Sequence, residues 1–164
     1  MYLLNEKPAT PEPVRPPFNI KVPIVSIAFL AVGLGLHFAF PARVFPGQWL
    51  QFAIGVPVIV LGIVIDIFAI RLFTEAHTDA SFADPAAKLV REGIYNRTRN
   101  PMYVAGMLIF LGIFLTVNAA RALIVLPFAF AYIRFGLIAR EEISLELLFG
   151  DEYRSYKARV RRWI

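Results

Sequence analysis

Four long apolar runs, separated by short polar connections, dominate the chain. They cover residues 22–40, 49–70, 102–117 and 122–139. An α-helix rises 1.5 Å per residue, so about 20 apolar residues cross a hydrocarbon layer of about 30 Å. The pattern therefore predicts an all-α integral membrane protein with four transmembrane helices. Residues 118–121 alone connect the last two runs, which must consequently form an antiparallel helical hairpin.

The composition supports this interpretation and excludes several kinds of chemistry. Of the 164 residues, 58% are hydrophobic and 18% are charged, whereas a soluble domain is about half apolar and a quarter charged. The absence of cysteine excludes disulfides, thiolate metal ligands and a cysteine nucleophile. No phosphate-binding glycine loop is present, and His77 has no neighbouring residue at a metal-ligand spacing, so we expect no metal site.

The positive charges indicate an orientation. Arg43 and Arg121 lie in the first and third connections, whereas nearly all other Lys and Arg residues fall on the opposite side of the predicted layer. The positive-inside rule then places both termini and the long connection 71–101 in the cytoplasm. This asymmetry accounts for the net charge of +5 without a nucleic-acid partner.

The two ends of the chain differ from the apolar middle. Residues 1–21 are rich in proline and predict an extended tail, which leaves residues 22–164 as a single domain. Residues 140–164 are polar and predict two short helices, with Gly150 as the C-cap of the first and Asp151 as the N-cap of the second. The second helix is basic and carries one apolar face, which favours contact with the cytoplasmic lipid surface. That face consists of Tyr153, Tyr156, Val160 and Trp163.

Two polar groups flank the hairpin, at residues 89–103 and residues 140–156. Because the hairpin returns the chain to the side from which it entered, we expect both groups to meet on the cytoplasmic face. Long connections that are not of low complexity are usually functional. This juxtaposition is the central geometric prediction from the sequence.

Two charged residues interrupt the apolar runs. Asp66 lies near the inner end of the second run and Arg134 lies within the fourth. Such residues usually face the bundle interior or a wet cavity, where the two could pair; snorkelling to the interface is the competing interpretation. Glu141 and Glu142 follow the fourth run, and by composition alone they mark the water boundary.

The polar groups resemble a known family. The matching residues are Gly93-Ile94-Tyr95, Arg99-Asn100-Pro101-Met102-Tyr103, Arg140-Glu141-Glu142 and Phe149-Gly150 with Tyr153 and Tyr156. They are similar to the isoprenylcysteine carboxyl methyltransferases, in a wider group that includes the phospholipid N-methyltransferases. The resemblance covers residues 89–164 closely and the second run loosely. Many members have Arg-His-Pro where this chain has Arg99-Asn100-Pro101, so one titratable group is absent here.

The resemblance implies an integral membrane enzyme that uses S-adenosylmethionine, bound at the cytoplasmic face between the loop motif and the C-terminal segment. The acceptor would be lipophilic and would enter sideways between helices. Expected catalytic residues are Asn100, Arg134 and Glu142. Expected cofactor-binding residues are Leu89, Val90, Gly93, Tyr95, Arg99, Asn100, Pro101, Tyr103, Glu141 and Glu142.

Several alternatives stay open at this stage. The acceptor is a carboxylate such as prenylcysteine, a phospholipid amine, or another small amphiphile. Sterol reductases that use NADPH resemble the same C-terminal half, but they tend to carry an Asp and a Cys where this chain has Glu141-Glu142 and no cysteine. A non-enzymatic membrane binding protein is the third class. The oligomeric state does not follow from the sequence.

Overall fold

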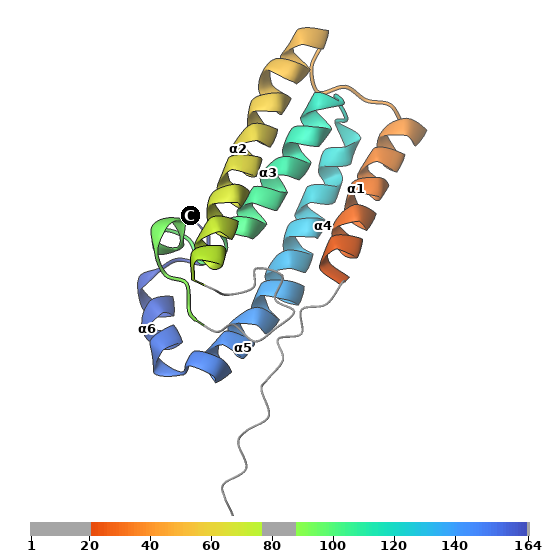
Figure 1. Ribbon diagram of the computed structural model, residues 1–164. Coiled ribbons are helices and arrows are strands. Elements are labelled where there is room, and N and C mark those ends of the chain that lie inside the picture. Colours follow the sequence, from red (N-terminus) through yellow and green to blue (C-terminus); the bar gives the residue numbers. More distant parts are fainter. Residues whose placement is uncertain (1–20, 77–87, 164) are drawn as a thin grey trace, which may run out of the picture.

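The computed structural model describes residues 21–76 and 88–163 of the chain, and all regular structure within these ranges is helical (Figure 1). The proline-rich tail and His77 lie outside the described residues. The elements in order are α1 (Lys21–Ala39), α2 (Gln48–Glu75), η1 (Gly93–Asn96), α3 (Pro101–Thr116), η2 (Arg121–Ile124), α4 (Val125–Ala131), η3 (Tyr132–Ile138), α5 (Ala139–Phe149) and α6 (Asp151–Arg159).

All four apolar runs form helices, as the pattern predicts. The elements from η2 to α5 join into one continuous helix, Arg121–Phe149, which lies beside α3 and runs antiparallel to it (Figure 1). The predicted hairpin is therefore confirmed. Two helices extend past their apolar runs: α2 continues to Glu75 and the last long helix continues to Phe149.

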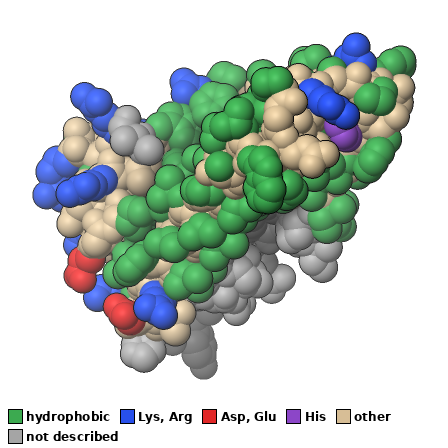
Figure 2. Space-filling view, turned by 90° about the horizontal axis from the view of Figure 1, so that it is seen from above, with side chains coloured by type: hydrophobic (Ala, Val, Ile, Leu, Met, Phe, Trp, Pro, Cys, Tyr) green, Lys and Arg blue, Asp and Glu red, His purple; other side chains and the backbone are tan. Residues whose placement is uncertain are grey.

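Two of the described helices are long and apolar enough to cross a membrane, namely α2 and Arg121–Phe149. The apolar stretches Ile24–Ala39 and Pro101–Thr116 are shorter, so four spans stay a prediction. Large apolar side chains on α2 are exposed, among them Phe52, Leu61 and Phe68 at 49%, 51% and 57%. Figure 2 shows apolar side chains along the body of one face, with Lys and Arg mainly towards its two ends. Such a surface fits lipid better than water.

Glycines bring α2 and α3 into backbone contact. A Cβ atom added to Gly62 would lie 2.9 Å from the Ala105 carbonyl oxygen, and one added to Gly55 would lie 2.9 Å from that of Gly112. These glycines are seven residues apart and share one side of α2. In the absence of a hydrophobic driving force between helices in lipid, such close approach is a main source of helix association. Close backbone contact at these glycines thus holds α2 against α3.

Asn118 joins the two connections at the end of the bundle opposite η1. Its Oδ1 accepts hydrogen bonds from the backbone N–H groups of Val44 (2.7 Å) and Phe45 (2.9 Å), and its Nδ2 donates to the Phe45 carbonyl (3.0 Å). Its φ of 55° lies in the left-handed region, which asparagine tolerates better than most residues. One side chain thereby ties the α1–α2 connection to the α3–η2 turn.

The fourth long helix contains a widened turn. Residues 132–138 are π-helical, with hydrogen bonds from i to i+5 in place of the usual i to i+4 pattern. Arg134 lies within this stretch. Local π-helical geometry occurs frequently at functional sites, and the apolar pattern of the sequence carried no sign of it.

The C-terminal helices differ from the prediction in two respects. Gly150, with φ of 51°, is both the C-cap of α5 and the N-cap of α6, and Asp151 is the first helical residue. The predicted lipid-facing surface of α6 is also wrong, because the apolar face packs inwards. Buried Tyr153, Tyr156 and Val160 form a cluster with Leu89 from the long connection, and Trp163 lies beyond the end of α6.

Candidate functional site

The C-terminal segment after α6 binds back onto the residues that precede α3. The Arg99 N–H donates to the Arg161 carbonyl (3.0 Å), the Thr98 hydroxyl donates to the Arg162 carbonyl (3.2 Å) and the Asn100 Nδ2 donates to the same Arg162 carbonyl (2.9 Å). Thr98 and Asn100 are buried. The Asn100 side chain therefore anchors the C-terminal segment to the loop motif.

Glu142 lies at the centre of a cluster of cations. Arg162 donates to both carboxylate oxygens, through Nε to Oε1 (2.9 Å) and through Nη2 to Oε2 (2.7 Å). Arg99 Nη1 lies 3.1 Å from Oε1, and Lys157 Nζ lies 3.9 Å from Oε2. The Glu142 and Arg99 side chains are each only 9% exposed. The expected meeting of the loop motif with the paired acids on one side of the bundle is thus confirmed.

The cations around Glu142 are held by further contacts. The hydrogen bonds to Glu142 raise the pKa of Arg162 above its usual value, so its charge is retained. Arg99 Nη1 also donates to the Tyr153 hydroxyl (3.4 Å), and Lys157 Nζ donates to Glu146 (3.3 Å). Charge-assisted bonds of this kind are the stronger class. Glu142 therefore links α5, α6, the loop motif and the C-terminal segment.

Glu141 has a different environment. Its Oε2 accepts a hydrogen bond from the Tyr103 hydroxyl (3.2 Å), and none of the described cations lies within ion-pair distance of it. Burial raises the pKa of Tyr95, and the negative charges of Glu141 and Asp66 raise it further. Burial raises the pKa of Glu141 itself to about 7, so this carboxyl group can take up or release a proton near neutral pH.

The short helix η1 is fixed by its neighbours. The buried Tyr156 hydroxyl donates to the Tyr95 carbonyl (2.8 Å), and the Tyr95 ring packs edge-on against Phe73 with centroids 5.4 Å apart. Gly93 has φ of 57°, and an added Cβ would lie 2.9 Å from a Leu72 methyl carbon. The loop motif is therefore held between α2 and α6.

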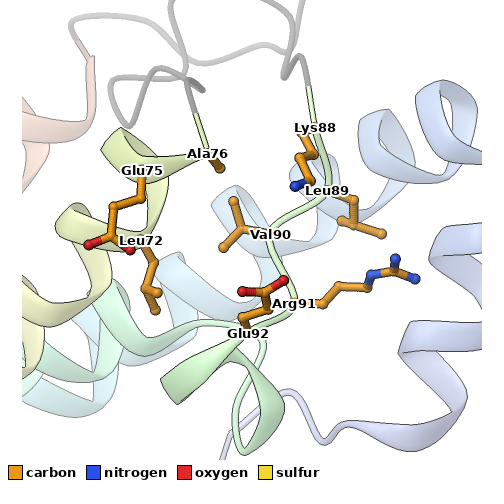
Figure 3. A pocket seen from close by; sticks show the side chains of 8 residues that line it. All are labelled: Leu72, Glu75, Ala76, Lys88, Leu89, Val90, Arg91 and Glu92. Carbon is orange, nitrogen blue, oxygen red and sulfur yellow. The ribbon is translucent and has the colours of Figure 1, made fainter.

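A pocket of about 100 Å³ opens beside this region, between the end of α2 and the segment that leads into η1 (Figure 3). Leu89 and Val90 line it, whereas Glu141 and Glu142 do not. The remaining lining residues are Leu72, Glu75, Ala76, Lys88, Arg91 and Glu92. Two of the expected cofactor-binding residues therefore border an open volume, and the paired acids are not among its lining residues.

Two further predicted site residues lie on the hairpin: Pro101 at the start of α3 and Arg134 in the π-helical stretch. Pro101 is fully buried and is the first residue of α3, the place where its fixed φ is best tolerated. Arg134 is half-buried, with its guanidinium carbon 5.3 Å from the centre of the Phe135 ring. None of the ion pairs in the described part of the chain joins Arg134 to Asp66. Arg134 is therefore not part of the Glu142 network.

Sequence reasoning missed two contributors to the site, Arg162 and Lys157, which pair with Glu142. Their basic character was interpreted as part of a lipid-facing surface. The burial of Glu142 reveals them, because a buried carboxylate requires cationic partners, but the sequence alone indicated that Glu141 and Glu142 mark the water boundary. Among the described residues, no group of three or more His, Asp or Glu side chains is arranged to hold a metal ion.

Comparison with known proteins identifies a family for the chain. The model of the phospholipid methyltransferase family matches residues 50–152, more than half of the chain. A 27-residue stretch is 70% identical to a protein of Haemophilus influenzae described only as uncharacterized, and the match covers 16% of this chain and 43% of that protein. The chain thus spans less than half the length of this relative. No solved structure matches the chain. On the family match, the chain belongs to the phospholipid methyltransferase family.

Proposed function

We propose that the protein is an S-adenosylmethionine-dependent methyltransferase that modifies a lipid amine at the cytoplasmic side of a membrane. Membership of the family implies a membrane methyltransferase. The single observation that carries the finer proposal is the contrast between the two acids: Glu142 is paired with three cations, whereas Glu141 has only the Tyr103 hydroxyl as a described partner.

The topology of the proposal has four membrane spans. Helix α3 has 16 residues and lies between the two longer candidate spans (Figure 1), so it passes through the same layer that they cross. Helix α1 packs mainly against η2, directly after the turn of the hairpin, and also against α4. The connection that carries the loop motif, the C-terminal segment and both termini then lie in the cytoplasm, in accordance with the positive-inside rule.

The residues of the site fit the cofactor. Its sulfonium carries the methyl group that the acceptor takes. Arg99 Nε is buried and has no hydrogen-bond partner among the described residues, so it is suited to a carboxylate. Half-buried Tyr103 offers an aromatic face for a cation or for adenine, Tyr95 supports the loop from the core, and the pocket bordered by Leu89 and Val90 adds an apolar wall. Gly93 and Pro101 shape the loop, Asn100 holds its closure, and Glu142 orients Arg99.

The surroundings of Glu141 favour an amine over a carboxylate as the acceptor. Glu141 accepts a hydrogen bond from Tyr103 and has no described cation as a partner, so its ionised carboxylate would attract an ammonium ion and repel a second carboxylate. An ammonium must lose a proton before its nitrogen can form a bond to carbon, and Glu141 is positioned to accept that proton. The Tyr103 hydroxyl would orient the carboxylate. A prenylcysteine carboxylate needs no base and is the competing acceptor.

Methyl transfer in nanodiscs tests the proposal. Wild-type protein is supplied with methyl-labelled S-adenosylmethionine and, separately, with an amine phospholipid and a prenylcysteine analogue. We expect label in the amine lipid and a loss of at least about 100-fold in kcat for Glu141→Gln, in the range of one positioned proton acceptor, with Glu152→Gln as the control, because Glu152 is exposed and pairs with Arg91 outside the Glu142 network. Label in the prenylcysteine alone would refute the amine assignment. Binding of NADPH without transfer would favour a reductase, and no binding of either cofactor would favour a binding protein.

A further inference from the structure

One face of the last long helix carries side chains at intervals of four residues: Phe130, Arg134, Ile138 and Glu142. Four residues make slightly more than one turn of an α-helix, which has 3.6 residues per turn. They make slightly less than one turn of the wider π-helix at residues 132–138. The two angular deviations have opposite signs, so these side chains stay on one face of the helix. Ile138 is 0% exposed and Glu142 is 7% exposed, so at the α5 end this face lies against the protein.

Arg134 is a cation without an anionic partner on this face. It is half-buried, its guanidinium lies beside the exposed Phe135 ring, and none of the described ion pairs includes it. A charged side chain at this depth of an apolar helix is costly and normally has a counter-charge. The contact with Phe135 compensates for only a part of that cost.

A second unpartnered donor lies next to the same face. The Trp163 ring contacts that of Phe130, one helical turn before Arg134, with centroids 4.9 Å apart. Its Nε1 is buried and has no acceptor among the described residues. An indole N–H can only donate, and leaving a buried donor unsatisfied is unfavourable. Arg134 and Trp163 thus present two hydrogen-bond donors and one positive charge, which together suit an anion.

We propose that Arg134 and the Trp163 indole bind the phosphodiester group of the acceptor lipid, and so select phospholipids over uncharged amphiphiles. Arg134 lies seven residues before Glu141, about 10 Å along the helix and roughly a quarter of a turn around it, because Arg134 shares the face of Glu142. The arginine side chain and a short headgroup can span this separation. Exposed Phe128 (65%) and Phe135 (69%) provide apolar surface for acyl chains. The inference rests on the proposed function, because it assumes that the headgroup amine lies at Glu141.

Lipid retention tests this subsite independently of methyl transfer. Wild-type protein and variants in detergent are incubated with equal amounts of phosphatidylethanolamine and diacylglycerol, and the lipid that stays bound is measured by native mass spectrometry. We expect wild-type protein to retain the phospholipid at least about tenfold better, in the range of a charge-assisted contact. Arg134→Gln should remove this preference, Arg134→Lys should restore part of it, and Trp163→Phe should weaken it. The control is Arg43→Gln, which removes an exposed charge at the opposite end of the bundle.

The outcomes separate the subsite from the proposed function. Equal retention of both lipids by wild-type protein, or unchanged selectivity in Arg134→Gln, would overturn the phosphodiester subsite even if methyl transfer to an amine is observed. Selective retention that is lost in Arg134→Gln would support the subsite even if S-adenosylmethionine does not bind, and the proposed function would then fail alone. Thermal unfolding of each variant distinguishes loss of the subsite from loss of the fold.

Discussion

At the scale of single residues, Glu141 and Glu142 are adjacent in sequence but have opposite surroundings. Glu142 is enclosed by Arg99, Arg162 and Lys157, whereas Glu141 meets the Tyr103 hydroxyl. Successive residues on a helix point about 100° apart, so one acid reaches the C-terminal segment and the other faces α3. We infer that Glu142 stabilises the site through its ion pairs, whereas Glu141 contacts the substrate.

The role of Glu142 predicts a large cost for its neutralisation. Glu142→Gln leaves Arg99 and Arg162 with no counter-charge, and removal of one partner from a buried ion pair typically costs about 3–5 kcal/mol. Denaturation in detergent should show a loss of this size. The matched control is Glu152→Gln, because Glu152 pairs with Arg91 where both side chains are over 40% exposed, and its loss should cost less than about 1 kcal/mol. Similar losses in both variants would contradict the assignment.

A second prediction at this scale concerns alkaline pH. Burial raises the pKa of Tyr156 to about 12, compared with about 10 in the unfolded chain. Above pH 10 the unfolded chain therefore loses this proton first, so the free energy of unfolding should fall as the pH rises from about 10 to about 12. Thermal unfolding followed at pH 9 and pH 11 measures the effect. Tyr156→Phe should show a smaller decrease, and an unchanged pH dependence in this variant would exclude Tyr156 as its source.

At the scale of elements, the glycine contact between α2 and α3 determines how the bundle packs. Gly62→Ala would place a Cβ 2.9 Å from the Ala105 carbonyl oxygen and 3.1 Å from the Ile109 amide nitrogen. Backbone atoms cannot move aside cheaply, so we expect a loss of about 1–3 kcal/mol. Gly106→Ala is the control, because nothing lies within 4 Å of its added Cβ. Equal thermal stability of the two variants would contradict this packing.

The elements also show how far sequence reasoning reaches. Long apolar runs and a connection of four residues suffice to predict the hairpin, because chain length leaves no other arrangement. The apolar face of α6 was correctly recognised, but its environment was not, since Tyr153 and Tyr156 suit a protein core as well as a lipid surface. Asn118 and Trp163 act through contacts with residues distant in sequence, which no local pattern reports.

At the scale of the whole molecule, the charged residues divide between the two ends of an apolar bundle. The α1–α2 connection, which contains Arg43, lies at one end, and α6 lies at the other (Figure 1). The proposed topology places these ends on opposite sides of the membrane, with α6 in the cytoplasm.

The absence of native cysteine makes this topology directly measurable. We expect a cysteine at Arg43 to react with an impermeant maleimide added outside intact cells, and a cysteine at exposed Ser155 to react only after permeabilisation. The reverse pattern would invert the orientation, and equal labelling of both positions before permeabilisation would exclude a sealed transmembrane arrangement.

The central claim is that the loop motif and the paired acids jointly bind a methyl donor, and calorimetry in detergent tests it most directly. S-adenosylmethionine is titrated into wild-type protein, Arg99→Lys and the exposed control Glu152→Gln, with NADPH titrated in parallel. Arg99→Lys keeps a positive charge beside Glu142 but removes the unpaired Nε donor. We predict saturable binding of S-adenosylmethionine to wild-type protein and to Glu152→Gln, affinity at least about tenfold weaker in Arg99→Lys, and no binding of NADPH. Absence of S-adenosylmethionine binding to folded wild-type protein, or equal affinity in all three proteins, would contradict the account.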